Sequence, residues 1–129
     1  MIDRVEVGAG PVVGLVHSSV AGARQWHRLM RDLEDRFHLV AVNLFGYGRT
    51  PVWSGQRAQT LQDQAELVLA VLPDAGPVSL VGHSFGGAVA MKAAEALGPR
   101  VDKLILFEPN PFYLMHLALI GPSIRGNCP

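Results

Sequence analysis

The chain has 129 residues, of which 49% are hydrophobic and 17% charged, as in one globular domain with an ordinary core. Eleven basic residues balance eleven acidic ones without a run of like charge, so neither a nucleic acid nor a membrane is expected as a partner. The one cysteine, Cys128, excludes an internal disulfide and a cysteine metal cluster. Neither a signal-peptide pattern nor a membrane-spanning apolar stretch is found, so a cytoplasmic protein is expected.

Short apolar segments alternate with helical patterns along the sequence. Four of these segments are rich in leucine or β-branched residues and are bounded by glycine or proline, as buried parallel strands are. The strands are predicted over residues 11–16, 38–44, 77–82 and 103–109, with a shorter strand over 4–7.

Apolar residues recur at three-to-four spacing between the strands, which predicts helices. The predicted helices span residues 21–36, 60–72 and 85–97, with a further helix over 111–120. Thr60 and Asp63 resemble a capping box at the start of the second helix. The alternation predicts a single doubly wound α/β domain over residues 1–129, with a mostly parallel sheet and a ligand site at the carboxyl ends of its strands.

The sequence GHSFGG, residues 82–87, falls between a predicted strand and a predicted helix. In so tight a turn the serine adopts a sparsely populated backbone conformation, and the residues two before and two after it come close together. Gly82 and Gly86 leave room there, and the Ser84 hydroxyl is lifted beside the helix N-terminus, where backbone N–H groups favour negative charge. The pattern indicates a nucleophilic serine, and the alternative is a glycine-rich turn without chemistry.

Four segments resemble the α/β-hydrolases in their order and spacing, and more closely the esterase-like branch of that family. They read LVHSS, VAVNLFGYGRT, VGHSFGGAVA and VDKLILFEP, at residues 15–19, 40–50, 81–90 and 101–109. The resemblance covers nearly the whole chain, but only the first half of the family's fold. It implies a serine hydrolase of small-molecule esters or related acyl substrates that acts through an acyl-enzyme, with no cofactor and no metal. Serine at position 84 separates the chain from relatives with aspartate there, the epoxide hydrolases and haloalkane dehalogenases.

The resemblance also implies the surroundings of the serine. The backbone N–H groups of Phe85 and Ser19 would form an oxyanion hole. The family usually has glycine at the position of Ser18, which bears on where the Ser19 N–H lies. His17 would orient loops in the look-alikes, and Asn43 stands where the family very often has aspartate, which indicates altered hydrogen bonding in that loop.

The family order of catalytic residues is serine, then acid, then histidine. After Ser84 the chain has three carboxylates and one histidine, namely Glu95, Asp102, Glu108 and His116. Glu108 is the candidate acid because it ends the strand that follows the nucleophile helix, although an acidic residue before proline also shapes a loop. His116 is interpreted as an ordinary residue of the helix over 111–120.

The strands that present the acid and the histidine in the family are expected to be absent, with residues 110–129 forming the start of the cap region and an atypical tail. Two interpretations stay open. The chain is an active acyl hydrolase, or it is a truncated, inactive fragment that binds a ligand or partner and lacks the triad histidine. Half a sheet would leave a strand edge uncovered, so a homo-oligomer through that edge, or a second polypeptide that supplies the missing parts, is expected.

Overall fold

The structure, a computed structural model, describes residues 1–108, so the predicted helix over 111–120, His116 and Cys128 lie outside the described residues. The five strands are β1 (Arg4–Val7), β2 (Val12–Val16), β3 (His38–Val42), β4 (Val78–His83) and β5 (Val101–Phe107). The helices are α1 (His27–Leu33), α2 (Leu61–Ala70) and α3 (Phe85–Leu97), with 3₁₀ turns η1 (Ala23–Trp26) and η2 (Gly98–Arg100). No helix among the described residues is long and apolar enough to span a bilayer.

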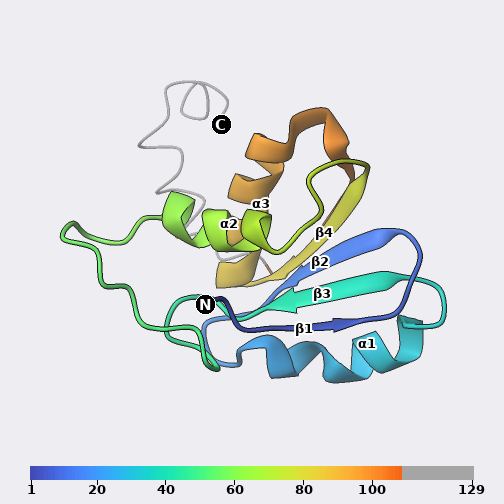
Figure 1. The fold of residues 1–129 in the computed structure, drawn as a ribbon, viewed down its shortest axis with the longest axis horizontal. Coiled ribbons are helices and arrows are strands. Elements are labelled where there is room, and N and C mark those ends of the chain that lie inside the picture. Colours follow the sequence, from blue (N-terminus) through green and yellow to red (C-terminus); the bar gives the residue numbers. More distant parts are fainter. Residues whose placement is uncertain (109–129) are drawn as a thin grey trace.

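The strands form one sheet in the order β1-β3-β2-β4-β5. Strand β2 pairs in parallel with β3 and β4, and β4 pairs in parallel with β5, so the predicted mostly parallel sheet is confirmed. Strand β1 runs antiparallel to β3 at one edge, which places the N-terminus beside the carboxyl ends of the other strands (Figure 1). At the other edge, no strand of residues 1–108 pairs with the outer side of β5.

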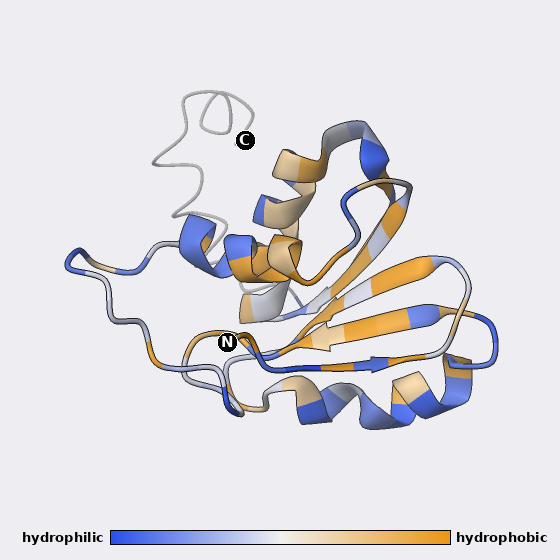
Figure 2. Cartoon of the chain, in the orientation of Figure 1, coloured by the Kyte–Doolittle hydropathy of each residue, from blue (hydrophilic) through white to orange (hydrophobic). Residues whose placement is uncertain are grey.

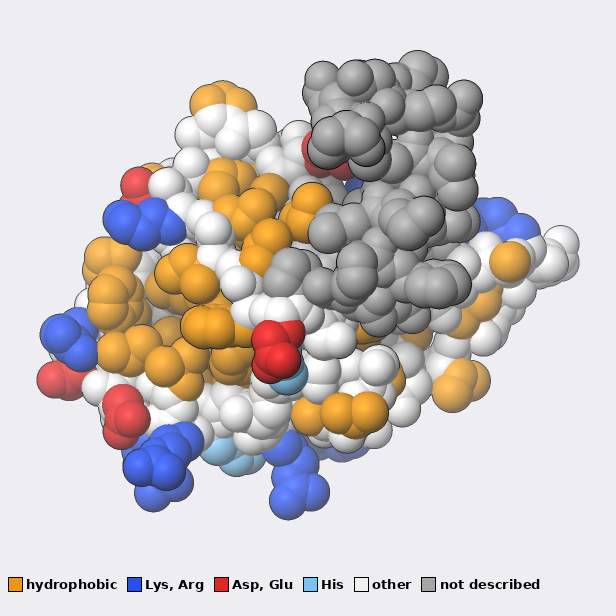
Figure 3. Space-filling view, turned by 180° about the vertical axis from the view of Figure 1, so that it is seen from behind, with side chains coloured by type: hydrophobic (Ala, Val, Ile, Leu, Met, Phe, Trp, Pro, Cys, Tyr) orange, Lys and Arg blue, Asp and Glu red, His pale blue; other side chains and the backbone are white. Residues whose placement is uncertain are grey.

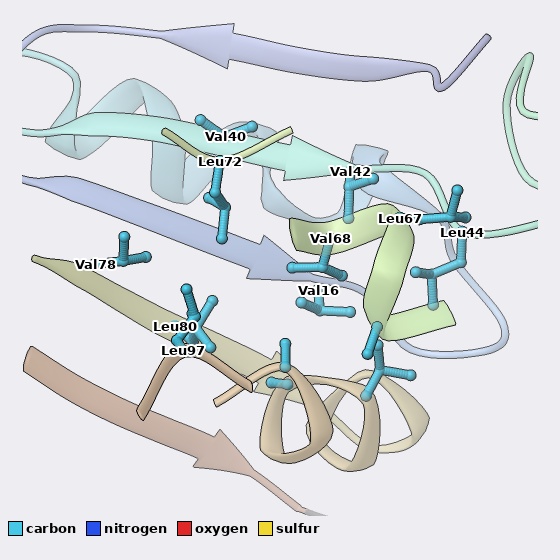
Figure 4. Close-up of a cluster of buried hydrophobic side chains, with 14 residues drawn as sticks. Val16, Val40, Val42, Leu44, Leu67, Val68, Leu72, Val78, Leu80 and Leu97 are labelled. Atoms are coloured by element: carbon cyan, nitrogen blue, oxygen red, sulfur yellow. The ribbon is translucent and has the colours of Figure 1, made fainter. Parts of the chain in front are cut away.

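The helices cover the two faces of the sheet, α2 and α3 on one and α1 on the other (Figure 1). The adjacent residues Leu15 and Val16 of β2 point to opposite faces, and both are fully buried. Figure 4 shows Val16 in the larger cluster, between β3, β4 and the helices α2 and α3. A strand that is buried on both faces is mostly apolar, which explains why hydrophobic residues predominate in the central strands (Figure 2).

Hydrophobic side chains also gather on the side of the molecule that faces away in Figure 1 (Figure 3). Among the described residues, β5 carries three of the large apolar side chains that are exposed: Leu104, Ile105 and Phe107. Apolar surface on an edge strand invites a further strand or another chain.

Several predicted boundaries differ from the observed ones by one or more residues. The first helix begins as a 3₁₀ turn at Ala23 and ends at Leu33, whose carbonyl accepts from both Arg36 and Phe37 and so turns the chain. Strand β3 ends at Val42 because the next residue bonds to the N-terminal segment. Strand β5 begins at Val101, directly after η2. The predicted capping box is present, since the side chains of Thr60 and Asp63 accept each other's backbone N–H groups.

The N-terminal segment anchors the loop that follows β3. The side-chain oxygen of Asn43 accepts from the Ala23 N–H at 2.9 Å, and its Nδ2 donates to an Asp3 carboxylate oxygen at 3.0 Å. Asp3 also accepts from the backbone N–H of Arg49, and this bond holds the pKa of Asp3 below its ordinary value. Thr50 donates to the carbonyl of Asn43. The amide at position 43 accepts from Ala23 and donates to Asp3 at once, which an ionised carboxylate there could not do.

The turn between β4 and α3 presses the first turn of α3 against the end of β2. A Cβ on Gly86 would lie 2.3 Å from the carbonyl oxygens of both Val16 and His17. A Cβ on Gly82 would lie 2.5 Å from the carbonyl oxygen of Gly86. All of these neighbours are backbone atoms that cannot rotate away, so both positions require glycine for lack of space.

Replacing Gly86 with alanine should therefore separate α3 from β2 and lower the free energy of unfolding by at least about 2 kcal/mol, measured by urea denaturation. Gly76→Ala is the control, because its added Cβ would meet nothing within 4 Å and only its positive φ of 92° opposes alanine. The backbone strain at Gly76 should cost about 1–2 kcal/mol without any steric contact. A loss below about 0.5 kcal/mol in Gly86→Ala would show that close approach is not what Gly86 provides.

Replacing Asn43 with aspartate should place two carboxylates in contact and lower the free energy of unfolding by about 1–3 kcal/mol at pH 7. The depressed pKa of Asp3 means that its hydrogen bonds stabilise the fold above its unfolded-state pKa and are lost as pH falls through the lower folded value. The loss in Asn43→Asp should shrink toward pH 4, because one carboxyl then takes up a proton and can donate. The exchanged pair, Asp3→Asn with Asn43→Asp, should regain at least half of the stability, and no recovery would contradict the assigned contact.

Candidate active site

The loops that leave the carboxyl ends of the parallel strands meet at one end of the sheet, where ligands bind in folds of this type. The β2–η1 loop (residues 17–22) follows β2, and the β4–α3 turn (residues 82–87) carries the serine singled out from the sequence. Gly86 lies against the carbonyl oxygen of His17, so the loop and the turn are in contact. Two segments far apart in the sequence therefore form one site.

Ser84 has the backbone conformation of a strained turn. Its φ is 55° and its ψ is −118°, a region that a residue with a side chain rarely adopts. Its N–H donates to the carbonyl of Phe107 at 3.0 Å, and its carbonyl accepts from the N–H of Gly87 at 2.9 Å. The side chain, which is partly exposed, does not cap α3 and makes no hydrogen bond within residues 1–108. The hydroxyl is thus presented at the N-terminus of a 13-residue helix.

The β2–η1 loop is held through both peptide groups of Ser18. The Ser18 N–H donates to Oε1 of Gln25 at 2.7 Å. The Ser18 carbonyl accepts from His17 Nδ1 at 2.7 Å and from the Ala21 N–H at 3.3 Å. In a trans peptide the C=O and N–H point in opposite directions, so the Ser19 N–H points away from these groups. Within the described residues it makes no hydrogen bond, which leaves it as an open donor at the end of the sheet.

His17 holds two loops together and has no ring nitrogen left for proton transfer. Its Nε2 accepts from the N–H of Leu44 at 3.1 Å, so Nδ1 carries the hydrogen and donates to Ser18. The ring is fully buried and packs against Tyr47, with ring centroids 4.5 Å apart. Burial lowers the pKa of the His17 imidazole and keeps it neutral. This agrees with the loop-orienting role that the resemblance implies for His17.

The structure places the candidate acid, Glu108, beside His83. A Glu108 carboxylate oxygen lies 3.6 Å from His83 Nε2, while the other ring nitrogen of His83 accepts from Nε2 of Gln25 at 3.0 Å. The Glu108 side chain is 89% exposed, and its φ is 45°, the only positive value besides that of Ser84 among the non-glycine residues described. Glu108 is therefore at the carboxyl end of the sheet, and its partner within the described residues is His83, which also contacts Gln25.

Two further carboxylates that follow Ser84 in the sequence, and two further histidines of residues 1–108, lie away from Ser84. Glu95 pairs with Lys92 along α3, and Asp102 pairs with Lys103 at the amino end of β5. His27 is exposed on α1, and His38 pairs with Glu6 at the amino end of β3.

Two glutamines contribute to the site without having been singled out in the sequence. Gln25 joins the β2–η1 loop to the β4–α3 turn. Gln64, which is buried on α2, accepts from the N–H of Phe45 at 3.1 Å and so fixes the loop after β3. The sequence signals Gln64 only as a polar residue next to the apolar stripe of α2, and it gives no signal for Gln25. The reason is that each glutamine bonds to a residue far away in the sequence.

Comparison with known proteins agrees with this geometry. A family model described as alpha/beta hydrolase fold matches residues 11–122. Lipase LipV of Mycobacterium tuberculosis is 38% identical over 120 residues, which make up 91% of this chain and 42% of the lipase. The pimeloyl-(acyl-carrier protein) methyl ester esterase of Pectobacterium carotovorum is 36% identical over 99 residues, 77% of this chain and 37% of the esterase.

Among solved structures, one of novel epoxide hydrolases from metagenomes of hot environments has a TM-score of 0.75 at 28% identity and covers 91% of this chain and 41% of its own. The chain thus spans about two fifths of the length of these relatives. The family model covers most of the chain, and the strand order and the strained serine turn fit it. The chain therefore belongs to the α/β-hydrolase family.

Proposed function

We propose that the chain carries the nucleophile of a serine hydrolase that acts on esters or related acyl substrates. The observation that carries the proposal is the conformation of Ser84, which has a positive φ at a strand-to-helix turn and a hydroxyl without a hydrogen-bond partner in residues 1–108. Strain of this kind persists only where the surrounding structure imposes it, and it is concentrated at functional sites. The names of the lipase and the methyl ester esterase to which the chain is similar support the substrate class.

The proposed reaction has two steps. The Ser84 oxygen attacks the acyl carbon, loses its proton to a base, and forms an acyl-enzyme as the alcohol leaves with a proton. Water then attacks the acyl-enzyme, releases the acid and returns the proton to Ser84. The negative oxygen formed in each step would be stabilised by the N–H groups of Phe85 and Ser19 and by the N-terminal end of α3.

Glu108 is proposed as the acid of this site, with a base that residues 1–108 do not supply. Its position at the end of β5, the neighbour of β4, supports this role. An acid in this role orients the base and stabilises its cation without taking up a proton.

A second candidate function is binding of an acyl ligand or a partner chain without turnover. It is favoured by the histidines of residues 1–108, since His17 and His83 are engaged in loop contacts while His27 and His38 lie elsewhere. A serine without a base typically loses about 10⁴-fold or more in rate. The exposed apolar side chains of β5 support a second copy or another chain as the partner. The cytoplasmic location stays a prediction that rests on the sequence.

The purified chain should react with a fluorophosphonate at Ser84, because the phosphoryl oxygen occupies the same donors as the acyl oxyanion. Mass spectrometry should place the adduct on the peptide that contains Ser84, and Ser84→Ala should abolish it. Ser54→Ala, a change in an exposed loop, is the matched control and should label as the wild type does. A folded wild-type chain that does not label would rule out an active serine hydrolase formed by this chain alone, whereas labelling without turnover of p-nitrophenyl esters would favour the binding function.

If the chain turns over esters, Glu108→Gln should lower kcat by at least about 10-fold, since the neutral amide cannot stabilise the cationic base. Fluorophosphonate should still modify Ser84 in this variant. Glu95→Gln removes an exposed carboxylate of α3 and serves as the control. An unchanged kcat in Glu108→Gln would contradict the proposed role of Glu108 as the acid and leave its contact to His83 as its only assigned interaction.

A further inference from the structure

Gln25 connects two parts of the site that are 58 residues apart in the sequence. Its Oε1 accepts from the N–H of Ser18 at 2.7 Å, and its Nε2 lies 3.0 Å from Nδ1 of His83. The first partner belongs to the β2–η1 loop and the second to the β4–α3 turn. One amide group therefore spans the two segments that would supply the oxyanion donors and the nucleophile.

We propose that Gln25 is a positioning residue, whose amide fixes the β2–η1 loop against the β4–α3 turn and so places the Ser19 N–H relative to the Ser84 hydroxyl. The inference rests on the proposed function, because it concerns the geometry of that reaction. Gln25 touches neither reacting group and acts through Ser18 and His83.

The backbone of Gln25 is anchored, which fixes the position from which its side-chain amide extends. Gln25 lies in the 3₁₀ turn η1, between Ala23 and Trp26, whose side chains are 1% and 6% exposed. The N–H of Gln25 donates to the carbonyl of Gly22 at 3.1 Å, and the N–H of Ala23 donates to Asn43. The turn is thus held by burial on one face of the sheet and by the loop after β3, so the position of the Gln25 amide follows from the fold.

The hydrogen-bonding capacity of each partner sets the orientation of the amide. The Ser18 N–H can only donate, so the oxygen of Gln25 must face it and the NH₂ group must face His83. The Nδ1 of His83 is therefore the acceptor and Nε2 carries the hydrogen, directed toward the carboxylate of Glu108 at 3.6 Å. Gln25 thereby selects the tautomer of the residue next to the nucleophile.

The contact to Ser18 has the greater consequence for the site. The Ser18 carbonyl is held by His17 and Ala21, but these bonds alone allow the peptide before Ser18 to rotate. The bond from the Ser18 N–H to Gln25 removes that freedom, so both peptides that flank the Ser18 Cα are fixed. A displacement of about 1 Å in a catalytic donor can reduce a rate by about 100-fold, which makes this restraint relevant to reactivity.

The test compares Gln25→Leu, which removes both contacts at similar size, with Gln59→Leu, which changes an exposed glutamine of the loop before α2. The rate constant for fluorophosphonate labelling at Ser84 should fall about 10- to 100-fold in Gln25→Leu, with little change in the reagent concentration for half-maximal rate. Gln59→Leu should label as fast as the wild type. Equal rates in wild type and Gln25→Leu would overturn the proposal.

Gln25→Glu separates the two contacts and guards against a leucine variant that does not fold. A carboxylate can still accept from the Ser18 N–H but cannot donate to His83 Nδ1. Labelling should therefore return to at least about one third of the wild-type rate, while the hydrogen of His83 moves to Nδ1. A Gln25→Glu rate as low as that of Gln25→Leu would contradict the role assigned to the Ser18 contact.

The His83 tautomer gives a readout that does not depend on labelling. Two-dimensional ¹H–¹⁵N NMR of the histidine rings should show Nδ1 of His83 unprotonated in the wild type, with this preference lost in Gln25→Leu and reversed in Gln25→Glu. A wild-type chain that fails to label but has this tautomer would sink the proposed function and leave the Gln25 contacts intact. A wild-type Nδ1–H tautomer would overturn the bridge itself.

Discussion

The close approach of α3 to the end of β2 is the constraint on which the candidate site depends. Gly86 touches backbone carbonyl oxygens of β2 and of the following residue, and Gly82 touches the first turn of α3. With no side chain at either position, β4 can turn directly into α3, and Ser84 is forced to a positive φ at the corner. The same approach brings the β2–η1 loop beside the turn. One steric condition therefore produces the exposed hydroxyl, the adjacent helix terminus and the neighbouring loop together.

Polar side chains restrain the loops at positions where the resemblance leads one to expect other residues. Serine replaces the usual glycine at position 18, and its φ is not in the left-handed region, so the loop conformation needs no glycine there. Its two peptide groups are instead held by Gln25 and His17. At position 43 an amide replaces the usual carboxylate, and Asp3 supplies the negative charge from the N-terminal segment. In both places the loop position is kept by a different set of hydrogen bonds.

The sequence was sufficient for the features that depend on local spacing. Short apolar runs predicted the strands and period-3.6 patterns predicted the α-helices among the described residues, and the Thr60 capping box needed only a three-residue spacing. The antiparallel direction of β1, the 3₁₀ start of the first helix and the contacts of Gln25, Gln64 and Asp3 could not be predicted. The partners lie between 19 and 58 residues away, except for Ser18, which is 7 residues from Gln25, and a lone glutamine or aspartate has no local pattern that reveals its acceptor or donor.

The proposed reaction needs a positioned hydroxyl and a group that takes up its proton, and residues 1–108 account for the first of these requirements. The serine turn and the neighbouring loop are built by the β4–α3 and β2–η1 units, so residues 1–108 suffice to present the Ser84 hydroxyl beside the β2–η1 loop. Stabilisation of an oxyanion by fixed donors does not require the base, and such donors alone retain part of the rate enhancement of serine hydrolases. Proton transfer requires a histidine near Ser84, and those of residues 1–108 are committed to loop contacts or lie elsewhere. A proton acceptor brought to Ser84 by later residues or by another chain would therefore meet a hydroxyl whose position the β4–α3 turn already fixes.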